Sequence, residues 1–86
     1  MMRDEVTKLV EQVPFVPFSI ELSSGRQVPV RSRDHIFMGV EKGSLIVVQD
    51  DKGLYDLLPI LHITALYHLV SLRSGLPYKE YYLYTL

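Results

Sequence analysis

Residues 44–58 read SLIVVQDDKGLYDLL, and this stretch decides the fold class. Residues 45–48 are a run of apolar side chains that favour β-strands. Residues 50–53 combine turn-forming side chains with a glycine that tolerates a positive φ. The pattern predicts a hairpin that pairs residues 44–49 with residues 54–58. Because the apolar run contains no polar alternation, we expect the first of these strands to be buried on both faces.

Residues upstream of the hairpin continue the β pattern. Residues 18–22 alternate apolar and polar side chains, which is typical of a half-buried strand. A turn at residues 23–25 separates them from residues 28–30, where the alternation resumes. Pro29 has no backbone N–H, so we expect it at a sheet edge or a bulge. Residues 36–40 supply a third apolar run.

A short helix is predicted near the start of the sequence. We expect it to cover residues 4–12, with Asp4 as its N-cap. Pro14 and Pro17 end it, because neither can donate the backbone hydrogen bond that a longer helix needs. The apolar residues at the i, i+3, i+4 and i+7 spacing of one helix face are Val6, Leu9, Val10 and Val13.

Residues 60–75 read ILHITALYHLVSLRSG and fit either a strand or a helix. Pro59 and Gly75 stand where the first turn and the end of a helix would have them. The segment shows too little polar alternation for periodicity to decide. We favour a strand through about Leu69, and residues 66–75 stay open between the two structures.

One helix followed by about five short strands predicts a mainly β protein of 86 residues in a single domain, 1–86. Within it we expect a helix at 4–12, a five-stranded small barrel of the SH3 or Sm kind at 16–69, and an extra C-terminal segment at 76–86. A chain this short builds a thin core. A homo-oligomer is therefore expected, since a partner subunit would add burial.

Composition narrows the classes of function. Nine Lys plus Arg against ten Asp plus Glu give a net charge of −1, which argues against binding nucleic acid by bulk charge. The lack of cysteine excludes disulfides, thiolate zinc sites and thiol nucleophiles. No secretory signal is visible, and no apolar stretch reaches the ~20 residues that span a bilayer. We expect a cytoplasmic protein without membrane contact.

The sequence shows no pattern typical of catalysis or metal binding. It contains no nucleophile elbow, phosphate-binding loop or dinucleotide fingerprint. His62 and His68 would lie about 20 Å apart along a strand, too far to share a metal ion with each other. Asp50 and Asp51 fit a plain turn better than a cation loop. We expect no enzymatic activity, no metal and no cofactor.

Arginines form the one suggestive charge cluster. Arg31 and Arg33 are expected on the outward face of the second strand and its extension, a geometry that suits phosphate contacts. The alternative is a solvated edge, offset by Glu21 and Asp34, that discourages unwanted strand pairing. The candidate nucleic-acid-binding residues are Arg26, Arg31, Arg33 and His35.

The C-terminal segment 76–86 holds four of the six tyrosines. With Lys79 they suit either a base-stacking platform or the anchors of a protein interface. We favour the interface, because added strand pairing with a neighbouring subunit would supplement a thin core. The candidate interface residues are Tyr78, Tyr81, Tyr82 and Tyr84.

From Val13 to about Leu66 the sequence, which begins here with VPFVPFSIELSSGRQVPV at residues 13–30, resembles a group of short uncharacterised bacterial proteins. These share a short helix, a Pro-Phe-x-Pro-Phe segment, a glycine hairpin and a closing Ile-Thr strand. The resemblance implies a common layout and no particular activity. The residues that carry it are Pro14, Phe15, Pro17, Phe18, Leu22, Gly25, Ile63 and Thr64.

More distantly, the sequence is similar to the Sm and Hfq-like RNA-binding proteins, which form rings by pairing strands between subunits. Leu22, Gly25 and Arg26 match the start of the first Sm motif, and Asp34 and His35 lie near its RNA-facing loop without matching it. The resemblance implies a strongly bent five-stranded barrel. We expect a protein that acts by self-association and protein interaction, with an RNA-binding ring as the alternative.

Overall fold

The structure, a computed structural model, describes residues 2–38, 45–71 and 77–85. It is mainly β with one N-terminal helix, as the sequence predicts. The helix is α1 (Met2–Glu11), and two single 3-10 turns are η1 (Arg33–His35) and η2 (Ile60–His62). The strands are β1 (Phe18–Leu22), β2 (Gln27–Val30), β3 (Ile36–Met38), β4 (Leu45–Gln49), β5 (Tyr55–Pro59), β6 (Ile63–Ser71) and β7 (Pro77–Thr85).

Helix α1 forms where the apolar spacing predicts it. Val6 and Leu9 are buried, and Met2 is buried one turn earlier. The helix begins at Met2, so the prediction that Asp4 is its N-cap is wrong. Asp4 lies inside the first turn, where its negative charge still interacts favourably with unpaired backbone N–H groups.

Strands β1 and β2 form the first predicted hairpin. Gly25 has a φ of 89° in the turn between them, a conformation in which other residues are strained. Pro29 lies opposite Ser19 on β2, which is an edge strand of its sheet. The edge position expected for Pro29 is confirmed, since an edge strand has no outer partner that needs its N–H.

Strands β4 and β5 form the second predicted hairpin. Gly53 has a φ of 84° in the turn. The carboxylate of Asp50 accepts hydrogen bonds from the backbone N–H groups of Lys52 and Leu54, each at 2.9 Å. Such a bond from an Asp side chain to the backbone that follows it fixes the turn, as the composition of residues 50–53 indicates.

The prediction that β4 is buried on both faces is wrong. Ile46 and Val48 are buried, whereas Leu45 is 46% exposed and Val47 is half-buried. Residues 45–48 are all apolar, so only Gln49 at the end of the strand marks the outer side with a polar side chain. The outer side stays open because no described element covers it.

Strand β6 decides between the two structures considered for residues 60–75. It is a strand that pairs with β1, and β7 pairs antiparallel along its other side, from Ser71↔Pro77 to Ala65↔Thr85. Residues 72–75 lie outside the described residues. The tyrosine-rich segment is thus the edge strand of a sheet within its own chain.

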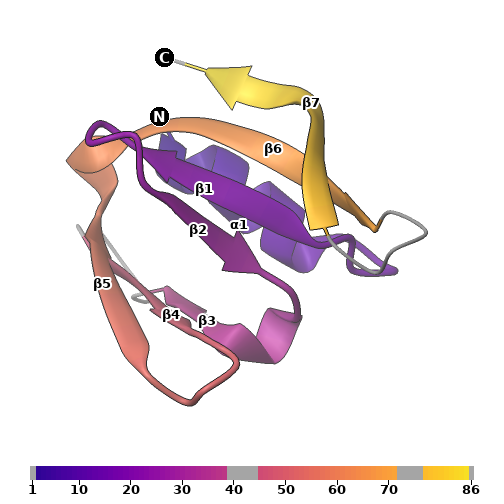
Figure 1. The fold of residues 1–86 in the computed structure, drawn as a ribbon, viewed down its shortest axis with the longest axis horizontal. Helices are drawn as coiled ribbons and strands as arrows, with labels where there is room; N and C mark the ends of the chain where they lie inside the picture. Colours follow the sequence, from indigo (N-terminus) through magenta and orange to yellow (C-terminus); the bar gives the residue numbers. More distant parts are fainter. Residues whose placement is uncertain (1, 39–44, 72–76, 86) are drawn as a thin grey trace.

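The strands form two antiparallel sheets, in the orders β2-β1-β6-β7 and β3-β4-β5. Figure 1 shows the smaller sheet below the larger one, with the chain running from β2 through η1 into β3. No strand pairing among the described residues joins the two sheets. The five-stranded closed barrel predicted for residues 16–69 is therefore not confirmed.

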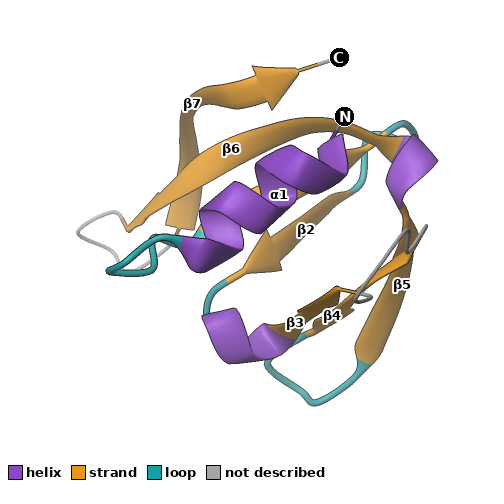
Figure 2. Ribbon diagram, turned by 180° about the vertical axis from the view of Figure 1, so that it is seen from behind, coloured by secondary structure: helices purple, strands orange, loops and turns teal. Residues whose placement is uncertain are grey.

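Both sheets and the helix share one hydrophobic core. Helix α1 lies across the larger sheet (Figure 2). Phe18 and Ile20 of β1, and Ile46 and Leu58 of the smaller sheet, are fully buried in the same cluster. The aromatic ring of Phe15 lies 6.0 Å from that of Phe18 and attaches the connector after α1 to this core.

Replacing Leu9 by alanine should lower the free energy of unfolding by about 2–5 kcal/mol, because it leaves a cavity in the core. Leu9 is only 3% exposed. The control is Lys8→Ala on the exposed side of the same helix, which should change the free energy of unfolding by about 0.5 kcal/mol or less. Urea titration measures both values. Equal losses of unfolding free energy in the two variants would contradict the claim that the core depends on α1.

Candidate functional site

Two of the candidate arginines join the two sheets. Arg26, in the turn between β1 and β2, forms an ion pair with Asp56 of β5 at 2.6 Å. Arg31, just after β2, forms one with Asp51 in the turn between β4 and β5 at 3.5 Å. All four side chains are at least one quarter exposed, so each pair contributes little to stability. Their charges are nevertheless paired within the chain.

Arg33 has a different role from the other two arginines. Its guanidinium donates hydrogen bonds to the carbonyl oxygens of Val10, at 2.7 Å, and of Gln12. It also lies over the ring of Phe15, 5.7 Å from the centroid. The carbonyls at the end of a helix lack intrahelical partners and carry partial negative charge. Arg33 therefore holds the end of α1 against η1.

The three arginines do not form one group. Arg26 and Arg31 are five positions apart in nearly extended chain, which corresponds to about 16 Å at the rise of a strand. Arg33 faces the helix. The acidic residues that offset them are Asp51 and Asp56, not the Glu21 and Asp34 expected from the sequence.

Arg31 and His35 do meet, at a small surface pocket of about 60 Å³. The pocket also contains Asp50 and Asp51, so its formal charge with neutral His35 is −1. Ligand pockets usually measure about 300–1,000 Å³. This one admits a few water molecules, and its charge does not favour a phosphate. Its lining residues are Pro29, Arg31, His35, Gln49, Asp50 and Asp51.

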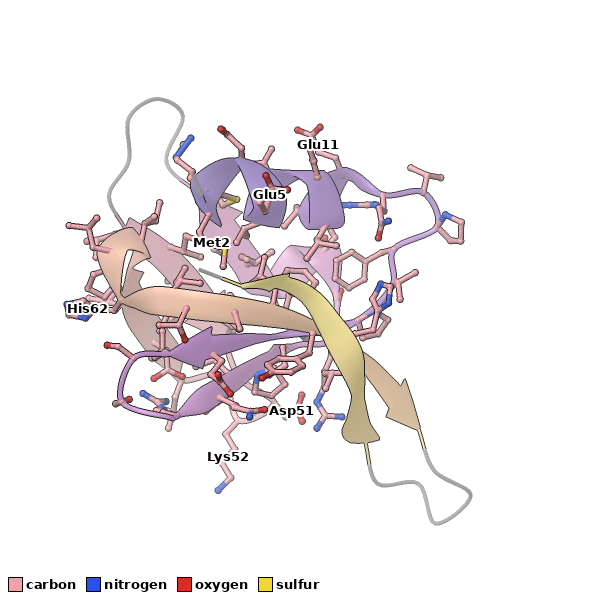
Figure 3. All side chains as sticks on the ribbon, turned by 90° about the horizontal axis from the view of Figure 1, so that it is seen from above. Met2, Glu5, Glu11, Asp51, Lys52 and His62 are labelled. Atoms are coloured by element: carbon pink, nitrogen blue, oxygen red, sulfur yellow. The ribbon has the colours of Figure 1, made fainter. Side chains whose placement is uncertain are left out.

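The remaining titratable residues are dispersed. Figure 3 shows Glu5 and Glu11 on α1, Asp51 and Lys52 on the opposite side of the molecule, and His62 at one end. Among the described residues, no three His, Asp or Glu side chains come together as metal ligands would. None of the helices in the described ranges is long and apolar enough to cross a membrane.

The four candidate interface tyrosines all fall in β7. The backbone of Tyr82 is paired with Tyr67 of β6, and that of Tyr84 with Leu66. The side chains of Tyr78, Tyr81, Tyr82 and Tyr84 lie outside the described part of the structure. Their role as interface anchors stays a prediction.

An exposed apolar surface on β3, β4 and β5 was missed by the sequence reasoning. Phe37 is 59% exposed and Leu57 is 64% exposed, although both belong to strands of the small sheet. The signal was present in the sequence, because Tyr55 and Leu57 alternate with Asp56 and Leu58. Apolar residues at both phases of a strand predict two apolar faces, of which a thin core covers one.

Comparisons with models of protein families, with curated proteins and with solved structures found no match. The function is therefore inferred from the residues and the geometry of this chain.

Replacing Arg33 by alanine should lower the free energy of unfolding by about 1 kcal/mol, because the helix carbonyls lose a charged donor at a solvent-exposed site. Arg33→Lys should not restore the loss, since an ammonium cannot reproduce the planar fork. Arg31→Ala, which breaks an exposed ion pair, should lower the free energy of unfolding by less than about 0.5 kcal/mol. Urea titration gives the three values, and an Arg33→Ala loss as small as that of Arg31→Ala would refute the role of Arg33.

Proposed function

We propose that this protein acts by self-association and protein interaction, without catalysis. The observation that carries the proposal is the open edge of β5, which is paired with β4 on one side only. An unpaired strand edge offers backbone N–H and C=O groups to a strand of another chain. The one charged residue of β5, Asp56, is ion-paired with Arg26. The edge is thus not protected by an unpaired charge.

The other edges are less suited to pairing, with one exception. Strand β2 carries Pro29, which interrupts its row of donors, and β3 is only three residues long. Strand β7 is nine residues long and covers the outer side of β6. The tyrosine-rich segment would therefore present its own outer edge to a neighbour, and it is the second surface of the proposal.

The strand order supports a small barrel of the SH3 or Sm kind. Strands β2 and β3 are separated by residues 31–35 alone. If they are counted as two halves of one bent strand, the order becomes β6, β1, the bent strand, β4 and β5. That gives the five strands expected from the sequence, with β7 as the extra C-terminal element. We propose this relationship on strand order, and it does not by itself imply RNA binding.

An RNA-binding ring is the alternative function for the same strand order. The closeness of Arg31 and His35 favours it, although the formal charge of −1 of the pocket that they line does not. The ion pairs of Arg26 and Arg31, and the use of Arg33 at the helix end, count against it. A protein that binds RNA through these residues would have to exchange those contacts for phosphates, with strong dependence on salt.

Light scattering of the full chain, with and without a short oligo-uridine RNA, tests the proposed function. We expect a mass above the 9.9 kDa of one chain that does not change with RNA. A monomer at every concentration would contradict self-association. A gain in mass with RNA at low salt, lost in the Arg31→Ala variant, would favour the alternative.

The same measurement on a chain that ends at Gly75 tests the second surface. Removal of β7 takes away the tyrosine-rich edge and leaves β6 as the new edge, so we expect a shift toward monomer or a loss of solubility. An unchanged, soluble assembly would show that the tyrosine-rich segment takes no part.

A further inference from the structure

The small sheet has one face that points away from the core. Phe37 lies opposite Val47, and Val47 lies opposite Leu57, so the three side chains form a row across β3, β4 and β5. Opposite residues share a face, and alternate residues along a strand point the same way. We call this surface the outer face. Its residues are Phe37, Leu45, Val47, Gln49, Tyr55, Leu57 and Pro59.

Much of the outer face is in contact with solvent. The exposed fractions are 59% for Phe37, 46% for Leu45, 59% for Tyr55 and 64% for Leu57. If a fully exposed large side chain presents about 200 Å², the outer face exposes on the order of 500 Å². An apolar patch of this size is near the upper end of what a monomer carries, and such patches are often functional.

We propose that the outer face of β3, β4 and β5 packs against the same face of a second copy of this chain. The inference rests on the proposed function, because it adds a further surface for self-association to the strand edges of β5 and β7. Two copies would together bury about 1,000 Å², which is the lower bound expected for a specific interface. Each copy in isolation leaves its own half of that area, on the order of 500 Å², in water.

The charge of the outer face is what selects a second copy as the occupant. In a two-fold dimer each residue meets the same surface patch on the partner, so a charged residue would be brought near its own copy. The outer face contains no Asp, Glu, Lys or Arg. The charged residue of β5, Asp56, lies at the other phase of the strand and pairs with Arg26. The outer face therefore meets itself without electrostatic repulsion.

The same composition disfavours RNA as the occupant, because RNA binding needs cations that meet phosphates. The uncharged composition of the outer face suits sheet packing, in which two apolar faces meet about 10 Å apart with interdigitated side chains. The aromatic residues Phe37 and Tyr55 are of the kind that contribute most at interfaces. The amide of Gln49 already donates to the carbonyl oxygen of Gly53 at 3.4 Å, so it need not be left unpaired in a dry interface.

Sedimentation equilibrium over a range of concentrations up to about 1 mM tests the proposal on the full chain. We expect a monomer–dimer equilibrium for the native sequence. Leu57→Lys and Phe37→Lys should each raise the dissociation constant more than tenfold, because each puts a charge in the centre of an apolar contact. The matched control is Val13→Lys, which makes the same change at an 88% exposed residue away from the small sheet.

Circular dichroism of each variant verifies that the fold is kept, which we expect because the substituted side chains are exposed. A self-associating protein whose dissociation constant stays within threefold in both Leu57→Lys and Phe37→Lys would overturn this proposal and leave the proposed function in place. A native chain that is monomeric throughout would overturn both. An equal effect of Val13→Lys would overturn the assignment to the outer face.

Discussion

The packing of α1 and two sheets around a single cluster is the constraint on which the rest of the structure depends. Val6 and Leu9 of the helix belong to the same buried cluster as Ile20 of the larger sheet and Ile46 of the smaller sheet. Each sheet contributes one face to this cluster. The described residues supply no further layer of helices or strands outside it. The other face and the edges of each sheet therefore determine how the protein can act.

The polar residues support the same arrangement. Arg26 and Arg31 each join the larger sheet to the smaller one, and Arg33 holds the end of α1. A charge cluster that suggests phosphate binding in the sequence thus acts within the chain. An exposed apolar surface lies on the small sheet, where Phe37 and Leu57 are in contact with solvent.

Local signals predicted most of the fold. The spacing of Val6 and Leu9 gave the helix, and Gly25 and Gly53 marked the two hairpin turns. The outer face was not predicted, because the apolar run at residues 45–48 of β4 carries no polar alternation to show which side is covered. The partners of the arginines were not predicted either. These partners depend on contacts between separate sheets or between residues far apart in the chain, such as Arg26 and Asp56, which are thirty positions apart. Local sequence patterns do not indicate such contacts.

The most direct test of this account uses the lack of cysteine in the chain. Val47→Cys places one thiol in the central row of the outer face with little change in size or polarity, and Lys52→Cys places one in the exposed turn. The measurement is the rate of labelling by a polar maleimide at low and high protein concentration. We expect the Val47→Cys variant to react at least tenfold more slowly when concentrated, while the rate of the Lys52→Cys variant does not change. A Val47→Cys rate that is independent of concentration would contradict self-association through the outer face.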